Sequence, residues 1–207
     1  MKTTNLSLQI LKPVVAATVA IVIICGLSVQ PARANYIVTL EQVGSNVVAT
    51  GSGAFDLSGL TFLNQGLGSP YMAASQGLIQ TGSAASTDVY TGFTGPTSFG
   101  SGGNVFASTS SGDFVTIVGS STPKMMMVPQ GYVSGHSLSD SMTFNNATFA
   151  SLGVTPGTYV WSWGTGTNQN FTLKIPSVPD SGSPLGLFFL SLIGLFGLNR
   201  LRHVQLA

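Results

Sequence analysis

The side chains that could support hydrolysis gather around one histidine. His136 lies in the stretch GHSLSD, residues 135–140, which places serine hydroxyls and a carboxylate near an imidazole in the sequence. A Ser-His-Asp relay uses these groups, but closeness along the chain is weak evidence for its geometry, and the chain contains no Gly-x-Ser-x-Gly turn. We therefore interpret His136 as a polar loop residue and predict that the protein is not an enzyme.

The remaining acidic residues indicate no metal or cofactor site. The chain contains neither a His-Glu-x-x-His zinc motif nor an EF-hand calcium loop. Two short glycine pairs, at residues 51–53 and 164–166, lack the full dinucleotide fingerprint. We expect no metal and no cofactor, and we expect loop positions near glycine or serine for the scattered aspartates, which are Asp56, Asp88, Asp113 and Asp140.

A set of aromatic residues offers a different kind of chemistry. Tyr159, Trp161 and Trp163 are spaced by two and would share one face of a strand. Facing inward, they would anchor a core together with Phe171. Facing outward, they would form a platform on which sugar rings could stack. We favour the core, because three exposed rings would create a large apolar patch, and we keep the carbohydrate contact as the alternative.

Composition limits the partners of the region between residues 35 and 175. Charged residues make up 6% of the chain, against a typical value of about 25%. This region has five acidic and two basic residues, a net charge of −3, from Glu41, Asp56, Asp88, Asp113 and Asp140 against Lys124 and Lys174. Without a basic patch to neutralise phosphates, nucleic-acid binding is excluded as an interpretation.

Turn residues and strand formers alternate through the same region. Residues 36–40 and 46–50 predict a hairpin around Gly44, and residues 158–163 are expected to pair with residues 170–175. The stretches 105–107 and 114–118 and the triplet Met125–Met127 also favour strands, with the methionines half-buried. Only residues 147–152 look helical. The pattern predicts an all-β fold, a single antiparallel β-sandwich of jelly-roll-like type.

Both ends of the chain indicate export. Lys2 and Lys12, an apolar run and the small-x-small pattern of Ala32 and Ala34 describe a signal peptide over residues 1–34, with cleavage at that pattern. The only cysteine, Cys25, lies inside it. We therefore expect the export translocon and signal peptidase as partners, and no disulfide in the mature ectodomain, residues 35–175.

The C-terminal residues predict a membrane segment. A Pro/Ser/Gly linker covers residues 176–184, and residues 185–199 are a hydrophobic stretch that we expect to form a short transmembrane helix. Arg200 and Arg202 follow it and predict that the tail, residues 200–207, stays in the cytoplasm. The prolines of the linker disfavour helix and keep it extended, as a processing enzyme requires.

The order of these features resembles the PEP-CTERM class of sorting signals, in its VPDSG variant. The motif residues are Val178, Pro179, Asp180, Ser181 and Gly182. This resemblance implies that an exosortase-like membrane protease removes the hydrophobic anchor. It also implies release or transfer of the protein to the bacterial surface, in organisms that make extracellular polysaccharide. The stretches 36–62 and 128–175 resemble the small secreted sandwich proteins that carry such tails.

From these observations we expect a non-enzymatic surface or extracellular-matrix protein. It would first be anchored in the inner membrane with its ectodomain outside the cytoplasm, and would then reach the cell surface or the extracellular space. An association with exopolysaccharide or a biofilm is part of what the resemblance implies. The alternatives are a carbohydrate-binding module that uses the aromatic face and, third, a secreted hydrolase.

Overall fold

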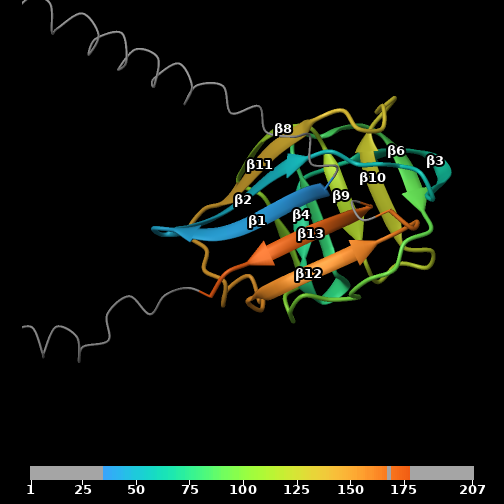
Figure 1. Ribbon diagram of the computed structural model, residues 1–207. Helices are drawn as coiled ribbons and strands as arrows, with labels where there is room; N and C mark the ends of the chain where they lie inside the picture. The colour runs from blue at the N-terminus through green and yellow to red at the C-terminus, as the bar shows by residue number, and fades with distance from the viewer. Residues whose placement is uncertain (1–34, 167–168, 178–207) are drawn as a thin grey trace, which may run out of the picture. The chain divides into compact units, whose positions relative to one another are not determined.

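The computed structural model describes residues 35–166 and 169–177, and these residues form two β-sheets (Figure 1). The predicted signal peptide with Ala32 and Ala34, the motif residues Val178–Gly182, the hydrophobic segment and both tail arginines lie outside the described residues. In the part of the chain that is described, no helix is long and apolar enough to cross a membrane.

Sheet A has six strands in the order β12-β13-β1-β2-β11-β8. Their bounds are β1 Asn35–Val43, β2 Asn46–Gly53, β8 Thr109–Gly112, β11 Leu138–Phe144, β12 Gly157–Ser162 and β13 Asn170–Ile175. Neighbouring strands are antiparallel except β1 and β13, which run parallel with Asn35 opposite Asn170 and Thr39 opposite Lys174. The expectation of a purely antiparallel arrangement is wrong at this pair, since the first and last strands lie side by side and point the same way.

Sheet B has seven strands in the order β3-β6-β10-β9-β5-β4-β7, all antiparallel. Their bounds are β3 Thr61–Gly68, β4 Tyr71–Ala73, β5 Leu78–Thr81, β6 Ala85–Thr91, β7 Asn104–Phe106, β9 Val115–Val118 and β10 Met125–Pro129. A single turn of 3₁₀-helix, η1 (Ala74–Gln76), joins β4 to β5 and ends at Gly77, which takes the left-handed conformation.

The two sheets share one apolar core. Side chains alternate along β1, so that Tyr36, Val38 and Leu40 are fully buried while Glu41 is exposed. The same cluster contains residues of both sheets, from sheet A Val47, Met142, Phe144, Phe171 and Leu173, and from sheet B Met72, Ile79, Val115, Ile117, Met126 and Val128. The all-β, two-sheet architecture that the sequence predicts is confirmed.

The structure tests the individual strands and the one helix that the sequence predicts. The hairpin of β1 and β2 and the pairing of β12 with β13 are confirmed, and Met125–Met127 form a half-buried strand. The helix predicted over residues 147–152 is wrong. The stretch instead folds as hydrogen-bonded turns. The Thr148 backbone N–H donates to the Ser151 hydroxyl oxygen at 2.8 Å, and the Ser151 backbone N–H donates to the Thr148 hydroxyl oxygen at 3.0 Å.

Candidate functional site

The aromatic residues of the strand β12 region point into the core. Trp161 is completely buried and Trp163 is 4% exposed. The Trp161 indole N–H donates to the Pro96 carbonyl at 2.9 Å, and the Trp163 indole N–H donates to the Asp56 carbonyl at 2.7 Å. Since both polar groups are satisfied inside the protein, the rings need no surface partner.

The prediction that these tryptophans pack in the core is therefore confirmed. The alternative, in which they face outward as a platform for sugar rings, is wrong. Trp161 meets Phe171 edge to face, with ring centroids 5.6 Å apart. Tyr159, the third residue of the set, is only half-buried; it packs near Phe99, and its hydroxyl donates to the Thr155 carbonyl at 3.0 Å. Stacking on a glycan needs rings that solvent can reach, and of the three rings only that of Tyr159 is partly exposed. The three residues therefore do not form a platform.

His136 lies where the sequence placed it, exposed in the loop before β11. Asp140, which a catalytic relay would need nearby, is instead 6% exposed and faces the core from β11. The two groups that are neighbours in the stretch GHSLSD therefore lie in different environments, the imidazole in solvent and the carboxyl in the core. In the described residues there is no group of three or more His, Cys, Asp or Glu side chains arranged to hold a metal ion.

The buried Asp140 is the polar centre that sequence reasoning missed. Its Oδ2 accepts hydrogen bonds from the Tyr36 hydroxyl and from Thr81 Oγ1, the latter at 2.8 Å. Tyr36 belongs to sheet A and Thr81 to sheet B, so the carboxyl joins the two sheets inside the core. Its second oxygen, Oδ1, is buried and has no hydrogen-bond partner among the described residues.

Burial dominates the electrostatics of this polar centre. It raises the pKa of Asp140 from 3.8 to about 6, although the hydrogen bonds from Tyr36 and Thr81 oppose the shift and the charge of Asp113 adds to it. Burial and the neighbouring carboxylate also raise the pKa of Tyr36 far above its usual range. Gly51 makes room for the pair, since a Cβ there would lie 2.4 Å from the Tyr36 hydroxyl oxygen and 2.5 Å from Asp140 Oδ1.

The expected loop positions of the aspartates are thus half right. Asp56 and Asp113 lie in loops, whereas Asp88 and Asp140 lie in strands β6 and β11. One signal could have found Asp140. In the stretch LSDSMTF, Asp140 is an even number of residues from Leu138, Met142 and Phe144, so all four side chains lie on the same, core-facing side of the strand.

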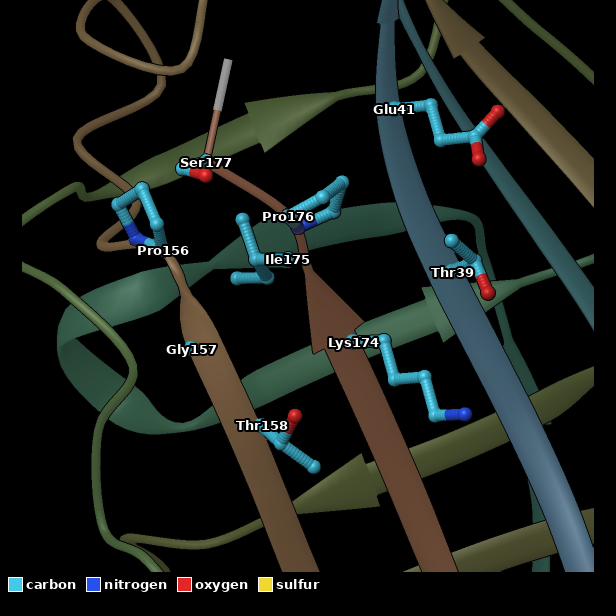
Figure 2. Close-up of a pocket in the computed structure, with 9 residues that line it drawn as sticks. All are labelled: Thr39, Glu41, Pro156, Gly157, Thr158, Lys174, Ile175, Pro176 and Ser177. Carbon is cyan, nitrogen blue, oxygen red and sulfur yellow. The ribbon is translucent and has the colours of Figure 1, made fainter. Parts of the chain in front are cut away.

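The end of the folded body carries a surface groove of about 540 Å³ (Figure 2). Thr39 and Glu41 of β1, Thr158 of β12 and Lys174 of β13 line it, and Lys174 extends from β13 toward β1. Both charged side chains are exposed. The groove is therefore open to solvent and combines charged and hydroxyl side chains of three adjacent strands with the apolar Pro156 and Pro176.

The same groove marks the point where the chain leaves sheet A. Ile175 ends β13 with its side chain buried, while Pro176 and Ser177 are exposed and line the groove. Pro176 cannot donate a backbone hydrogen bond, so the ladder of sheet A stops there. Ser177 is the last described residue before Val178, the first residue of the motif.

Comparisons with known proteins agree with this boundary. No curated protein and no solved structure was found to match the chain. Residues 177–202 match the family model of the VPDSG-CTERM motif, so the match begins two residues after the last strand ends. A motif of this kind implies an exported protein that is anchored in a membrane, processed by an exosortase-like membrane protease and then carried to the surface. The chain thus carries a C-terminal VPDSG-CTERM motif, which is consistent with a sorting-domain protein of the PEP-CTERM type.

Proposed function

We propose that this chain is a non-enzymatic surface or extracellular-matrix protein that is exported, held briefly by its C-terminal segment and then processed. The observation that carries the proposal is the match of residues 177–202 to the VPDSG-CTERM motif. In this proposal the signal peptide, residues 1–34, is cleaved after Ala34, residues 185–199 span the inner membrane and residues 200–207 stay inside. The ectodomain, residues 35–175, is a jelly-roll-like sandwich outside the cytoplasm.

The position of the motif supports this route. Pro176 and Ser177 are exposed and make no strand pairing, whereas Ile175 is still part of the β13 ladder. A protease must hold its substrate in an extended form, and a site within a sheet would require unfolding first. Because the match begins just beyond the last described strand, we expect the enzyme to cut outside the β13 ladder.

A matrix role is favoured over enzymatic chemistry by the character of the described surface. The groove at the end of β13 is lined by threonine, serine, glutamate, lysine, proline, glycine and isoleucine, and its described lining contains no histidine or cysteine. The only described carboxyl with a strongly raised pKa, that of Asp140, is buried inside the core, where no substrate reaches it. An association with extracellular polysaccharide is the further part of this proposal, through polar surface groups and not through Trp161 or Trp163.

Mass spectrometry of cell-surface material tests the proposal. In cells that contain an exosortase-type enzyme, the mature protein is expected to begin at Asn35 and to lack residues 185–198. The double variant Pro179→Ala/Asp180→Ala should keep the hydrophobic segment and remain in the membrane fraction. The matched control is Ser183→Ala, which changes the linker outside the motif and should be processed normally. A wild-type surface form that still carries residues 185–198 contradicts the proposal.

A further inference from the structure

Strand β3 is the longest unpaired edge of the two sheets. It pairs with β6 on one side, and no hydrogen bond between described residues joins its other side to the rest of the chain. The other edges are short or capped. β7 and β8 have three and four residues, and β12 is held at its end by two backbone hydrogen bonds of 2.9 Å between Thr94 and Ser162.

This edge lacks most of the features that keep free strands apart. Natural edge strands discourage pairing by charged residues, prolines, short length or bulges. The stretch TFLNQGLG of β3 contains no charged residue and no proline. Three of its apolar side chains are exposed, Phe62 at 52%, Leu63 at 46% and Leu67 at 84%. A bulge at Leu63 interrupts the register, but Asn64–Gly68 continue regularly along β6.

The exposed side chains of β3 are spaced symmetrically. Phe62, Gln65 and Leu67 pair with Tyr90, Asp88 and Ser86 of β6, three positions that are two residues apart. They share the face of sheet B that carries Met126 and Val128, because these two core residues of β10 lie opposite Tyr90 and Asp88. Gln65 is therefore midway between Phe62 and Leu67 on this face.

This spacing is self-complementary. If two β3 strands pair antiparallel about a two-fold axis at Gln65, Phe62 of one copy lies beside Leu67 of the other, and the contact occurs twice. The charged residue opposite Gln65 is Asp88 on β6. The two Asp88 residues would be three strand spacings apart, about 14 Å, which exceeds the screening length of about 8 Å at physiological salt.

We propose that two copies of this chain associate through β3, antiparallel about Gln65, so that sheet B continues from one copy into the next. Water can satisfy the free N–H and C=O groups of an edge strand, but another extended backbone can pair with the whole row at once. A second copy supplies one with matching apolar side chains and no opposing charge. The proposal stands on β3 alone and does not depend on the sorting signal.

Cysteine cross-linking of the full chain in detergent micelles tests this pairing. Cys25 is the only cysteine of the chain, so a Cys25→Ser background leaves introduced thiols unique. Gln65→Cys is expected to form a disulfide-linked dimer on mild oxidation, because the axis brings the two thiols together. The matched control is Ser111→Cys on β8, an exposed residue of another uncharged edge. Equal cross-linking of both variants, or none with Gln65→Cys, overturns the proposal.

A second measurement separates pairing from chance contact. In the Gln65→Cys background, Phe62→Lys together with Leu67→Lys should lower the cross-linked fraction at least tenfold, since like charges then meet across the axis. Both side chains are more than half exposed, so the fold should tolerate the change, which circular dichroism checks. The control Val160→Lys on β12, also at an exposed apolar residue, should leave the dimer intact. A dimer that survives the double change overturns the proposal.

Discussion

The hydroxyl of Tyr36 donates a hydrogen bond to the buried carboxyl of Asp140, across 104 residues of sequence. Thr81 donates to the same carboxylate oxygen from the opposite sheet. A charge that is shielded from water in this way is costly unless the group takes up a proton. The contact therefore links the stability of the fold to pH.

Asp140 should make the protein less stable as the pH rises from about 4 to about 6. Its pKa is about 6 in the folded state against an ordinary value of 3.8, so the native state binds the proton more tightly than the unfolded chain. The stabilisation is complete below the unfolded value and is lost as the pH passes through the folded one. The shift corresponds to about 3 kcal/mol. Urea unfolding at several pH values measures it.

The variant Asp140→Asn isolates this effect. It should abolish the decline between about pH 4 and pH 6, because an amide cannot ionise. Glu41→Gln is the control, since it removes an exposed carboxyl on the groove and should keep the decline. If the wild-type protein shows the same free energy of unfolding at pH 4 and pH 6.5, the description of Asp140 as a buried acid is wrong.

A methyl group at Gly51 should disturb the same contact. The added Cβ of Gly51→Ala would lie 2.4 Å from the Tyr36 hydroxyl oxygen and 2.5 Å from Asp140 Oδ1, both closer than van der Waals contact allows. We expect a loss of about 1–3 kcal/mol in stability, as for overpacking in a core. Gly103→Ala, where nothing lies within 4 Å of the added Cβ, is the control and should change stability by less than about 0.5 kcal/mol. Equal losses at both positions would contradict the crowding.

Trp161→Ala should destabilise the fold by about 3–5 kcal/mol, because it opens a large cavity beside Phe171 and leaves the Pro96 carbonyl without its donor. The neighbouring Val160→Ala, at a side chain 44% exposed, should cost well under half as much. Thermal unfolding of both variants provides the comparison. A folded Trp161→Ala protein of unchanged stability would mean that the ring does not pack in the core.

Removal of residues 178–207 should change where the protein is found. A chain that ends at Ser177 keeps every described strand, so it should fold and appear in the soluble exported fraction rather than with membranes. Fractionation with an antibody to the ectodomain measures this. The control exchanges the membrane segment for an unrelated transmembrane helix, which should restore membrane retention. Unchanged fractionation of the truncated chain would count against a C-terminal anchor.

Much of the fold could be predicted from alternating apolar residues, because this pattern lies within each strand and does not depend on distant parts of the chain. The β1–β2 hairpin and the β12–β13 pair follow from strand formers around glycine-rich turns. β8 escaped prediction because Thr109–Gly112 contains only small polar residues, and β3 lacks the alternation that indicates a half-buried strand. These two strands form because each pairs by backbone hydrogen bonds with a neighbouring strand, and such long-range pairing cannot be predicted from a single sequence.

The candidate site was predicted unevenly for a related reason. The sorting motif is a linear signal, so sequence order alone identifies it. Asp140 is defined by partners 104 and 59 residues away, which no local pattern brings together. The interior position of Trp161 was favoured correctly on physical grounds, since exposed rings would be costly. Its hydrogen bond to Pro96 could be seen only in the fold.

If the chain is exported with its N-terminus first, as we propose, the parallel pairing of β1 with β13 fixes when sheet A can be completed. Until residues 157–175 have emerged on the far side, sheet A lacks two of its six strands and β1 has an open flank. The domain can close only when the last strand arrives, a pairing of the greatest sequence separation and hence a late step. In the proposed route, a tail that then holds the protein at the membrane would keep it there while β13 pairs with β1.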